Sequence, residues 1–142
     1  MSHPLGTSLA FIDTNVWLYA FIDNQDPRKA QIAKELLRNT PNIVVGLQVI
    51  NEVCVNLVKN ELMDEADIRV LIDTFYAKHH VIDLTYDILQ KASHLRERFT
   101  LSFWDSLIIA TAIISGCTYV VSEDMQDGLR VENQLTIVNP FK

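Results

Sequence analysis

The chain has 142 residues, of which 49% are hydrophobic and 21% charged, with four Gly and four Pro. This composition excludes disordered, fibrous and disulfide-dense proteins and fits one globular domain. Its formal net charge of -6 argues against a protein that binds nucleic acid through basic residues alone. The longest apolar stretch, 107–114, is far shorter than the ~20 residues that cross a bilayer, and no basic and apolar leader is visible, so we expect a cytoplasmic protein with no membrane role.

The first half of the chain alternates short strand-like runs with longer helical patterns. Asp26 and Pro27 form an N-cap and first helical position, and apolar residues recur after them at helical spacing. In chain order, the predicted elements are a strand at 9–13, a helix from 27 to about 39, a strand at 43–45 and a helix at 47–60.

The second half continues this alternation. Its predicted elements are helices at 65–76, 86–98 and 103–115, strands at 80–84, 118–122 and 135–138, and an acidic turn at 123–128. The helix at 103–115 is apolar nearly all round, which predicts burial on most sides. Alternating strands and helices indicate a three-layer α/β/α sandwich with a mostly parallel central sheet. We expect one domain over 1–142, with 1–8 as a polar N-terminal tail.

Two aspartates follow predicted strands of this sheet. Asp13 ends the first strand, and Asp124 follows the strand at 118–122. Ligands of open parallel sheets bind outside the carboxyl ends of the strands, so both side chains are candidate site residues. A structural role explains each equally well at this stage, because Asp13 fits the N-cap of a following helical turn and Asp124 fits a turn aspartate.

Two further acids lie on predicted helices. Asp105 stands in the first turn of the apolar helix, where an ionised carboxylate is costly without a partner. Ser102, three residues earlier, completes a capping pattern that explains Asp105 equally well. Glu52 lies roughly opposite the apolar face of its helix, so periodicity alone predicts a solvated glutamate.

Other residues give weaker functional signals. Cys54 and Cys117 lie in apolar runs and are expected to be reduced core thiols. Trp17, Tyr19 and Trp104 are candidates for stacking on nucleobases, although core packing is the preferred interpretation. No HExxH, GxSxG, P-loop or dinucleotide-binding motif is present.

Basic residues that would hold a nucleic-acid strand are few. The candidates are two pairs on predicted helices, Arg96 with Arg98 and Arg28 with Lys29. Surface charges without a function explain each of them as well.

Four short motifs stand in a particular order along the chain: FIDTNV at 11–16, NEV at 51–53, FWDS at 103–106 and VSED at 121–124. In this order and spacing the chain resembles the PIN-domain nucleases, and most resembles the VapC-like toxins of bacterial toxin–antitoxin pairs. The resemblance extends over about residues 9–138.

The resemblance implies a Mg²⁺- or Mn²⁺-dependent ribonuclease that cleaves single-stranded or looped RNA. It implies a homodimer that an antitoxin protein inhibits, with Thr14 and Ser122 as polar helpers of the site. The implied catalytic and metal-binding residues are Asp13, Glu52, Asp105 and Asp124.

Two alternatives stay open from the sequence. Glu123 or Asp127, beside Asp124 in the acidic turn, also fits the fourth ligand role. The alternative function is a catalytically inactive PIN-like module that binds RNA or a protein partner.

Overall fold

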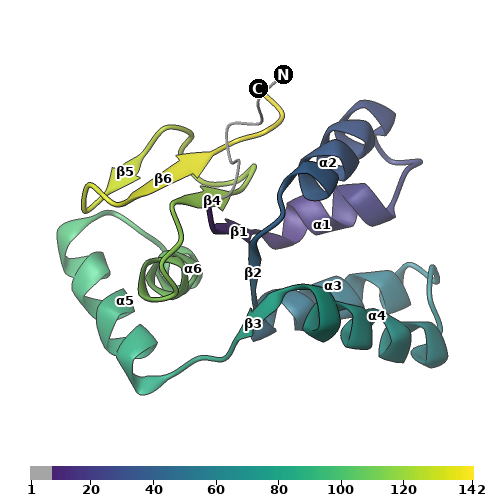
Figure 1. Ribbon diagram of the computed structural model, residues 1–142, viewed down its shortest axis with the longest axis horizontal. Helices are drawn as coiled ribbons and strands as arrows, with labels where there is room; N and C mark the ends of the chain where they lie inside the picture. The colour runs from purple at the N-terminus through teal and green to yellow at the C-terminus, as the bar shows by residue number, and fades with distance from the viewer. Residues whose placement is uncertain (1–7) are drawn as a thin grey trace.

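A six-stranded sheet forms the centre of the computed structural model, which describes residues 8–142 (Figure 1). The predicted tail therefore lies, apart from Ser8, outside the described residues. Neighbouring strands run parallel except for the antiparallel pair β5 and β6, and the spatial order is β3-β2-β1-β4-β6-β5. The strands are β1 (Ala10–Ile12), β2 (Ile43–Gly46), β3 (His80–Ile82), β4 (Tyr119–Val121), β5 (Arg130–Val131) and β6 (Leu135–Val138).

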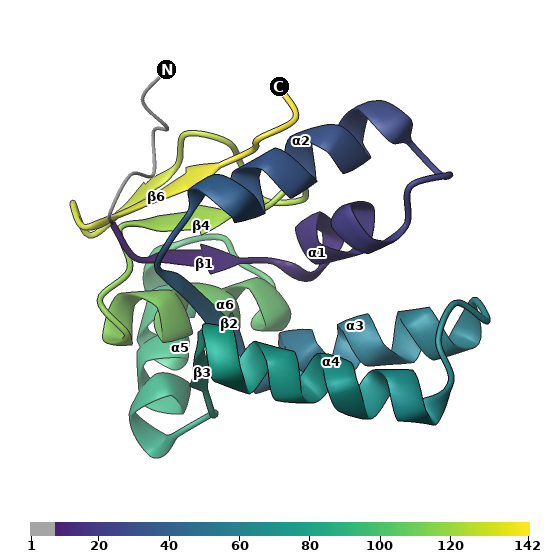
Figure 2. The same ribbon diagram turned by 45° about the vertical axis from the view of Figure 1, so that its right-hand side comes forward.

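Helices cover both faces of the sheet. Figure 1 shows α1 to α4 on one side of the strands and α5 with α6 on the other, and Figure 2 shows the same division after a 45° turn. The predicted three-layer α/β/α architecture is thus confirmed. The helices are α1 (Thr14–Phe21), α2 (Pro27–Asn39), α3 (Leu47–Lys59), α4 (Glu65–Lys78), α5 (Tyr86–Arg98) and α6 (Phe103–Ile114).

The central strands are short and fully apolar because both of their faces are covered. All residues of β1 and β2 are buried, as expected for parallel strands between two helical layers. Helix α6 buries five consecutive residues, 108–112, which confirms the burial predicted from its apolar sequence. Asp26 caps α2 by accepting a hydrogen bond from the Lys29 N–H, as predicted.

Two elements differ from the sequence prediction. Helix α1 has eight residues where only a helical turn after Asp13 was considered, because the run 14–21 is apolar on most sides and gives no clear period. A strand, β5, lies between the acidic turn and β6, where a single final strand was expected. It has only two residues and pairs through a turn in which Glu132 and Asn133 have positive φ angles, so it is too short to produce an alternating pattern.

The connections place a topological switch point between β1 and β4. From β1 the chain continues to β2 and β3 on one side, whereas β4 and β6 lie on the other. Open α/β sheets bind ligands at such a point, outside the carboxyl ends of the strands. Among the described residues, no helix is both long and apolar enough to span a membrane.

Candidate active site

Asp13 is a buried carboxylate at the switch point. It directly follows β1, and its N–H donates a 2.9 Å hydrogen bond to the carbonyl of Val121 on β4. The side chain is only 6% exposed. Its Oδ1 accepts from the N–H of Thr14 at 2.8 Å, and its Oδ2 accepts from the Ser122 hydroxyl at 2.8 Å. Asp13 is therefore both the N-cap of α1 and a fixed acid at the edge of the sheet, so the two predictions are compatible.

The surroundings of Asp13 favour its protonated form. Burial raises the pKa of Asp13 from 3.8 to about 6, although the hydrogen bonds from Ser122 and Thr14 oppose this shift. Repulsion from Asp124 and from Asp105 also contributes to this raised value. Two of the other three predicted acids, one from α6 and one from the turn after β4, are thus close enough to act on Asp13 electrostatically.

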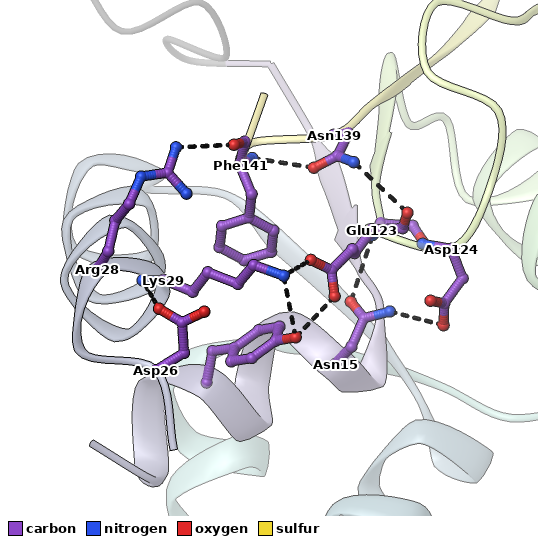
Figure 3. Close-up of polar contacts among 10 residues, drawn as sticks. Asn15, Asp26, Arg28, Lys29, Glu123, Asp124, Asn139 and Phe141 are labelled. Carbon is purple, nitrogen blue, oxygen red and sulfur yellow. Dashed lines mark hydrogen bonds and ion pairs between the residues drawn. The ribbon is translucent and has the colours of Figure 1, made fainter. Parts of the chain in front are cut away.

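Asp124 is joined to Asp13 through Ser122. The fully buried Ser122 hydroxyl accepts the backbone N–H of Asp124 at 3.2 Å while it donates to Asp13. The exposed Asp124 carboxylate accepts a 2.9 Å hydrogen bond from Nδ2 of Asn15 in the first turn of α1 (Figure 3). Asn15 Oδ1 in turn accepts the Glu123 N–H at 3.4 Å. The turn after β4 is therefore held on the start of α1.

The other two acids of this turn face different partners. Figure 3 shows the Glu123 carboxylate directed to Lys29 of α2, with which it forms an ion pair, and Tyr19 also donates to it at 2.7 Å. Burial raises the pKa of Glu123, but the hydrogen bonds from Lys29 and Tyr19 outweigh it and keep the pKa below its usual value. Asp127 accepts the N–H of Asn139 at 2.7 Å. Of the three, only Asp124 contributes to the electrostatics of Asp13.

Asp105 stands in the first turn of α6, and its backbone is capped as predicted. The Ser102 hydroxyl accepts the Asp105 N–H at 3.0 Å. In the described part of the chain, the Asp105 carboxylate makes no return bond to Ser102, whereas Asp64 and Asp67 complete both halves of such a box on α4. The cap therefore leaves the half-buried Asp105 carboxylate free for another partner.

Glu52 is half-buried, so its predicted position in open solvent is wrong. Its helix α3 packs against α1, which brings the polar side of α3 toward Thr14. Burial raises the pKa of Glu52, and the Thr14 hydroxyl partly offsets this. The contact of the buried Thr14 hydroxyl with Glu52 falls short of a well-formed hydrogen bond, and this hydroxyl has no other hydrogen-bond partner among the described residues.

These donors suit a hydrated, hard divalent cation. Among residues 8–142, no three His, Cys, Asp or Glu side chains are close enough together to ligate one metal ion directly. Mg²⁺ needs no such cage, since it prefers oxygen ligands, keeps several waters and is usually held by one or two carboxylates. A cation would also relieve the repulsion that raises the pKa of Asp13, and the residues present therefore fit such an ion.

The sequence matches the PIN domain family over residues 10–127. The chain belongs to the PIN domain family. All four predicted acids, together with Thr14 and Ser122, lie inside the matched range. No curated protein is significantly similar in sequence.

Solved structures confirm the PIN-like fold. A toxin–antitoxin complex from Klebsiella pneumoniae is 22% identical, with a TM-score of 0.68, and the match covers 92% of this chain and 97% of that one. VapC20 of Mycobacterium tuberculosis, described as a sarcin–ricin loop cleaving toxin, is 21% identical, with a TM-score of 0.62 and coverage of 78% and 86%. VapBC2 of Rickettsia felis, bound to a promoter DNA fragment, is 19% identical, with a TM-score of 0.62 and coverage of 92% and 99%.

Sequence reasoning assigned no role to Asn15, although it lies inside the motif FIDTNV of this PIN domain. Among the described residues, its amide makes the only side-chain hydrogen bond between α1 and the Asp124 carboxylate. The position of Asn15 was the available signal, because it stands two residues after Asp13, the acid that follows β1.

The predicted RNA-contacting cations of this PIN domain have partners within the chain. Arg28 donates to the Phe141 carbonyl at 2.9 Å, and Arg98 donates to Glu132 at 2.8 Å. Arg96 donates to the Ser106 hydroxyl at 2.7 Å, and its guanidinium lies 3.8 Å from the centre of the Phe103 ring. These contacts give the arginines structural roles, as the ion pair with Glu123 does for Lys29.

Proposed function

We propose that this PIN domain is a divalent-metal-dependent endoribonuclease. The observation that carries the proposal is the buried Asp13 carboxylate, fixed by Ser122 and repelled by Asp105 and Asp124 at the carboxyl ends of the parallel strands. Folding keeps these acids together despite a cost in electrostatic energy, which is typical of a site that works with a cation bound.

In this proposal Asp13 and Asp105 would hold Mg²⁺ or Mn²⁺, and Asp124 would hold it through water. When bound, the metal would neutralise negative charge on the phosphodiester and activate a water molecule. Ser122 keeps Asp13 oriented and Asn15 keeps Asp124 oriented through their hydrogen bonds. Glu52, whose pKa is raised by burial, would accept the proton of the attacking water.

The decisive experiment is RNA cleavage by the purified protein with Mg²⁺, with Mn²⁺ and with excess EDTA. We expect cleavage only with metal, and loss of at least 100-fold in rate for Asp13→Asn and Asp105→Asn, with unchanged circular dichroism. Asp73→Asn, an exposed position on α4, is the matched control and should cleave like wild type. Cleavage that survives EDTA would contradict the metal mechanism, and a protein that binds RNA without cleaving it would support the inactive module.

We further propose that the nuclease is the toxin of a type II toxin–antitoxin pair and forms a homodimer. The Klebsiella relative is a toxin–antitoxin complex by its title. An apolar groove of about 660 Å³ between α3 and α4, with Val55, Val58 and Tyr76 exposed, offers a surface of the kind that protein partners cover. The net charge of -6 favours a partner with a basic residue that reaches the acids.

Two measurements test these partners. Light scattering at working concentration should give a mass near twice 16.2 kDa, and a monomer would contradict the dimer. A neighbouring gene for a small protein, whose product binds this chain and stops cleavage, is expected for a toxin. A housekeeping nuclease would have no such gene.

A further inference from the structure

A second feature of the site is a pocket of about 320 Å³ that Glu52 helps to line. Its volume lies at the small end of the range for ligand sites in proteins. Four of its lining residues, Leu47, Gln48, Asn51 and Glu52, form one face of the first turns of α3, and Trp104 of α6 closes the opposite side. Glu52, one of the acids assigned to catalysis, lines this pocket directly, and Asp105 follows Trp104 in the first turn of α6.

Several polar side chains that line this pocket have no hydrogen-bond partner in the described part of the chain. Among the described residues, the side-chain amides of Gln48 and Asn51 have no hydrogen-bond partner, and neither has the indole N–H of Trp104. Trp17 differs in every respect. It is 4% exposed, its N–H donates to the Ile12 carbonyl at 3.2 Å, and its ring contacts Phe21 and Phe75. Core packing, the preferred interpretation for both tryptophans, therefore explains Trp17 well and Trp104 only in part.

We infer that this pocket binds one unpaired nucleobase of the RNA strand beside the scissile phosphate, and that it favours adenine. The inference rests on the proposed ribonuclease function. The indole of Trp104 supplies a stacking surface, which every base accepts. The amides of Gln48 and Asn51 each present a donor beside an acceptor, the pattern that pairs with the amino group and adjacent ring nitrogen of adenine.

Glu52 sharpens this preference. Its carboxylate, which the proposed function assigns to the attacking water, places negative charge in the pocket lining and so repels the carbonyl oxygens of uracil. Uracil is therefore the base that the pocket should accept least. A base bound here lies against Glu52, so its own phosphate is within one nucleotide of the acids assigned to catalysis.

The test uses fluorescein-labelled octamers of uridine in which a single adenosine is moved through every position, with the all-uridine octamer as reference. KM and kcat are measured with Mn²⁺, and binding is measured by anisotropy with Ca²⁺. We expect one adenosine position to lower KM. Trp104→Ala should raise KM for that octamer by roughly 5- to 150-fold with kcat little changed, since base stacking on one aromatic ring contributes that much affinity.

Two sets of variants separate stacking and edge recognition from effects on folding. Trp104→Phe should recover most of the affinity. Gln48→Ala with Asn51→Ala should reduce the preference for adenosine, with Glu52 left to disfavour uracil, while the melting temperature stays unchanged. Phe103→Ala is the matched control, because Phe103 is 72% exposed, stacks on Arg96 and lies outside the pocket. It should leave KM unchanged.

The outcomes distinguish this inference from the proposed function. An adenosine preference and a KM that survive both the Trp104 and the amide variants would overturn the base pocket while cleavage still supports a ribonuclease. If wild type cleaves no RNA with either metal, the ribonuclease proposal fails and the binding measurement decides the pocket: affinity unaffected by Trp104→Ala or by the amide changes overturns it.

Discussion

The hydroxyl of Ser122 donates a 2.8 Å hydrogen bond to Oδ2 of Asp13, although the two residues are 109 positions apart in the sequence. Both side chains are buried, and Ser122 also accepts the backbone N–H of Asp124. One hydroxyl therefore sets the positions of two acids that come from different strands. Because Ser122 links β1 to β4, substituting it should disturb the site even though Ser122 itself need not contact RNA or metal.

Ser122→Ala should damage both stability and catalysis. Asp13 would lose a buried hydrogen bond, which costs about 1–3 kcal/mol of the free energy of unfolding when an acceptor is left unpaired. Because the Ser122 hydroxyl lowers the pKa of Asp13, the acidic limb of the pH–rate profile should move to higher pH. Urea unfolding and a pH profile measure the two effects. Ser93→Ala, at an exposed position of α5, is the control, and equal behaviour of the two variants would contradict the role of Ser122.

The metal-free protein should lose stability as pH rises through about 6. The folded state raises the pKa of Asp13 from 3.8 to about 6, so it binds the proton more tightly than the unfolded chain does. The resulting stabilisation is fully present below pH 3.8 and is lost as pH rises through 6. A difference of about two pKa units corresponds to about 3 kcal/mol.

The measurement is the melting temperature in EDTA between pH 5 and 7.5, for wild type and for Asp13→Asn. The variant keeps a side chain that caps helices well but does not titrate. It should remove most of the slope that wild type shows over this range. Parallel curves for the two proteins would show that Asp13 does not titrate there.

Asp105→Asn should raise the melting temperature of the metal-free protein. Ser102 caps the Asp105 backbone N–H, and this contact survives the change, while one of the charges that repel Asp13 is removed. Adding Mg²⁺ at 100 times its Kd should stabilise wild type by about 2.7 kcal/mol and the variant much less. Thermal scans with EDTA and with Mg²⁺ measure both. Identical shifts in the two proteins would indicate that the acids serve separately as caps and surface charges.

Glu123→Gln and Asp124→Asn should differ, although the residues are adjacent. The Glu123 carboxylate is occupied by Lys29 and Tyr19, so its loss should weaken the contact between the turn and α2 and leave metal-dependent cleavage within a few-fold of wild type. The Asp124 carboxylate acts on Asp13, so its loss should reduce cleavage at least ten-fold. Rates at several Mn²⁺ concentrations compare them. The reverse order would assign the fourth ligand role to Glu123.

The sequence by itself determined most of the secondary structure, because hydrophobic period and capping residues are local signals. Asp26 with Pro27 predicted the start of α2, and the apolar run after Ser102 predicted the buried α6, and both predictions are confirmed. The strand alternation likewise predicted the three-layer fold. It missed β5 and the full length of α1, since a two-residue strand and a short apolar helix produce no period.

Only the tertiary structure decided which acids share one environment. Asp13 and Asp124 meet because β1 and β4 are adjacent in the sheet, a pairing that no local pattern encodes. The adjacent residues Asp124 and Glu123 lie in different environments because their side chains point in different directions. Asp124 contacts Asn15, and Glu123 contacts Lys29. Glu52 is half-buried because α3 packs on α1, which overrides the exposure that its own helix period predicts. Burial and charge proximity depend on residues far apart in the chain, so a pKa such as that of Asp13 becomes defined only when the fold is complete.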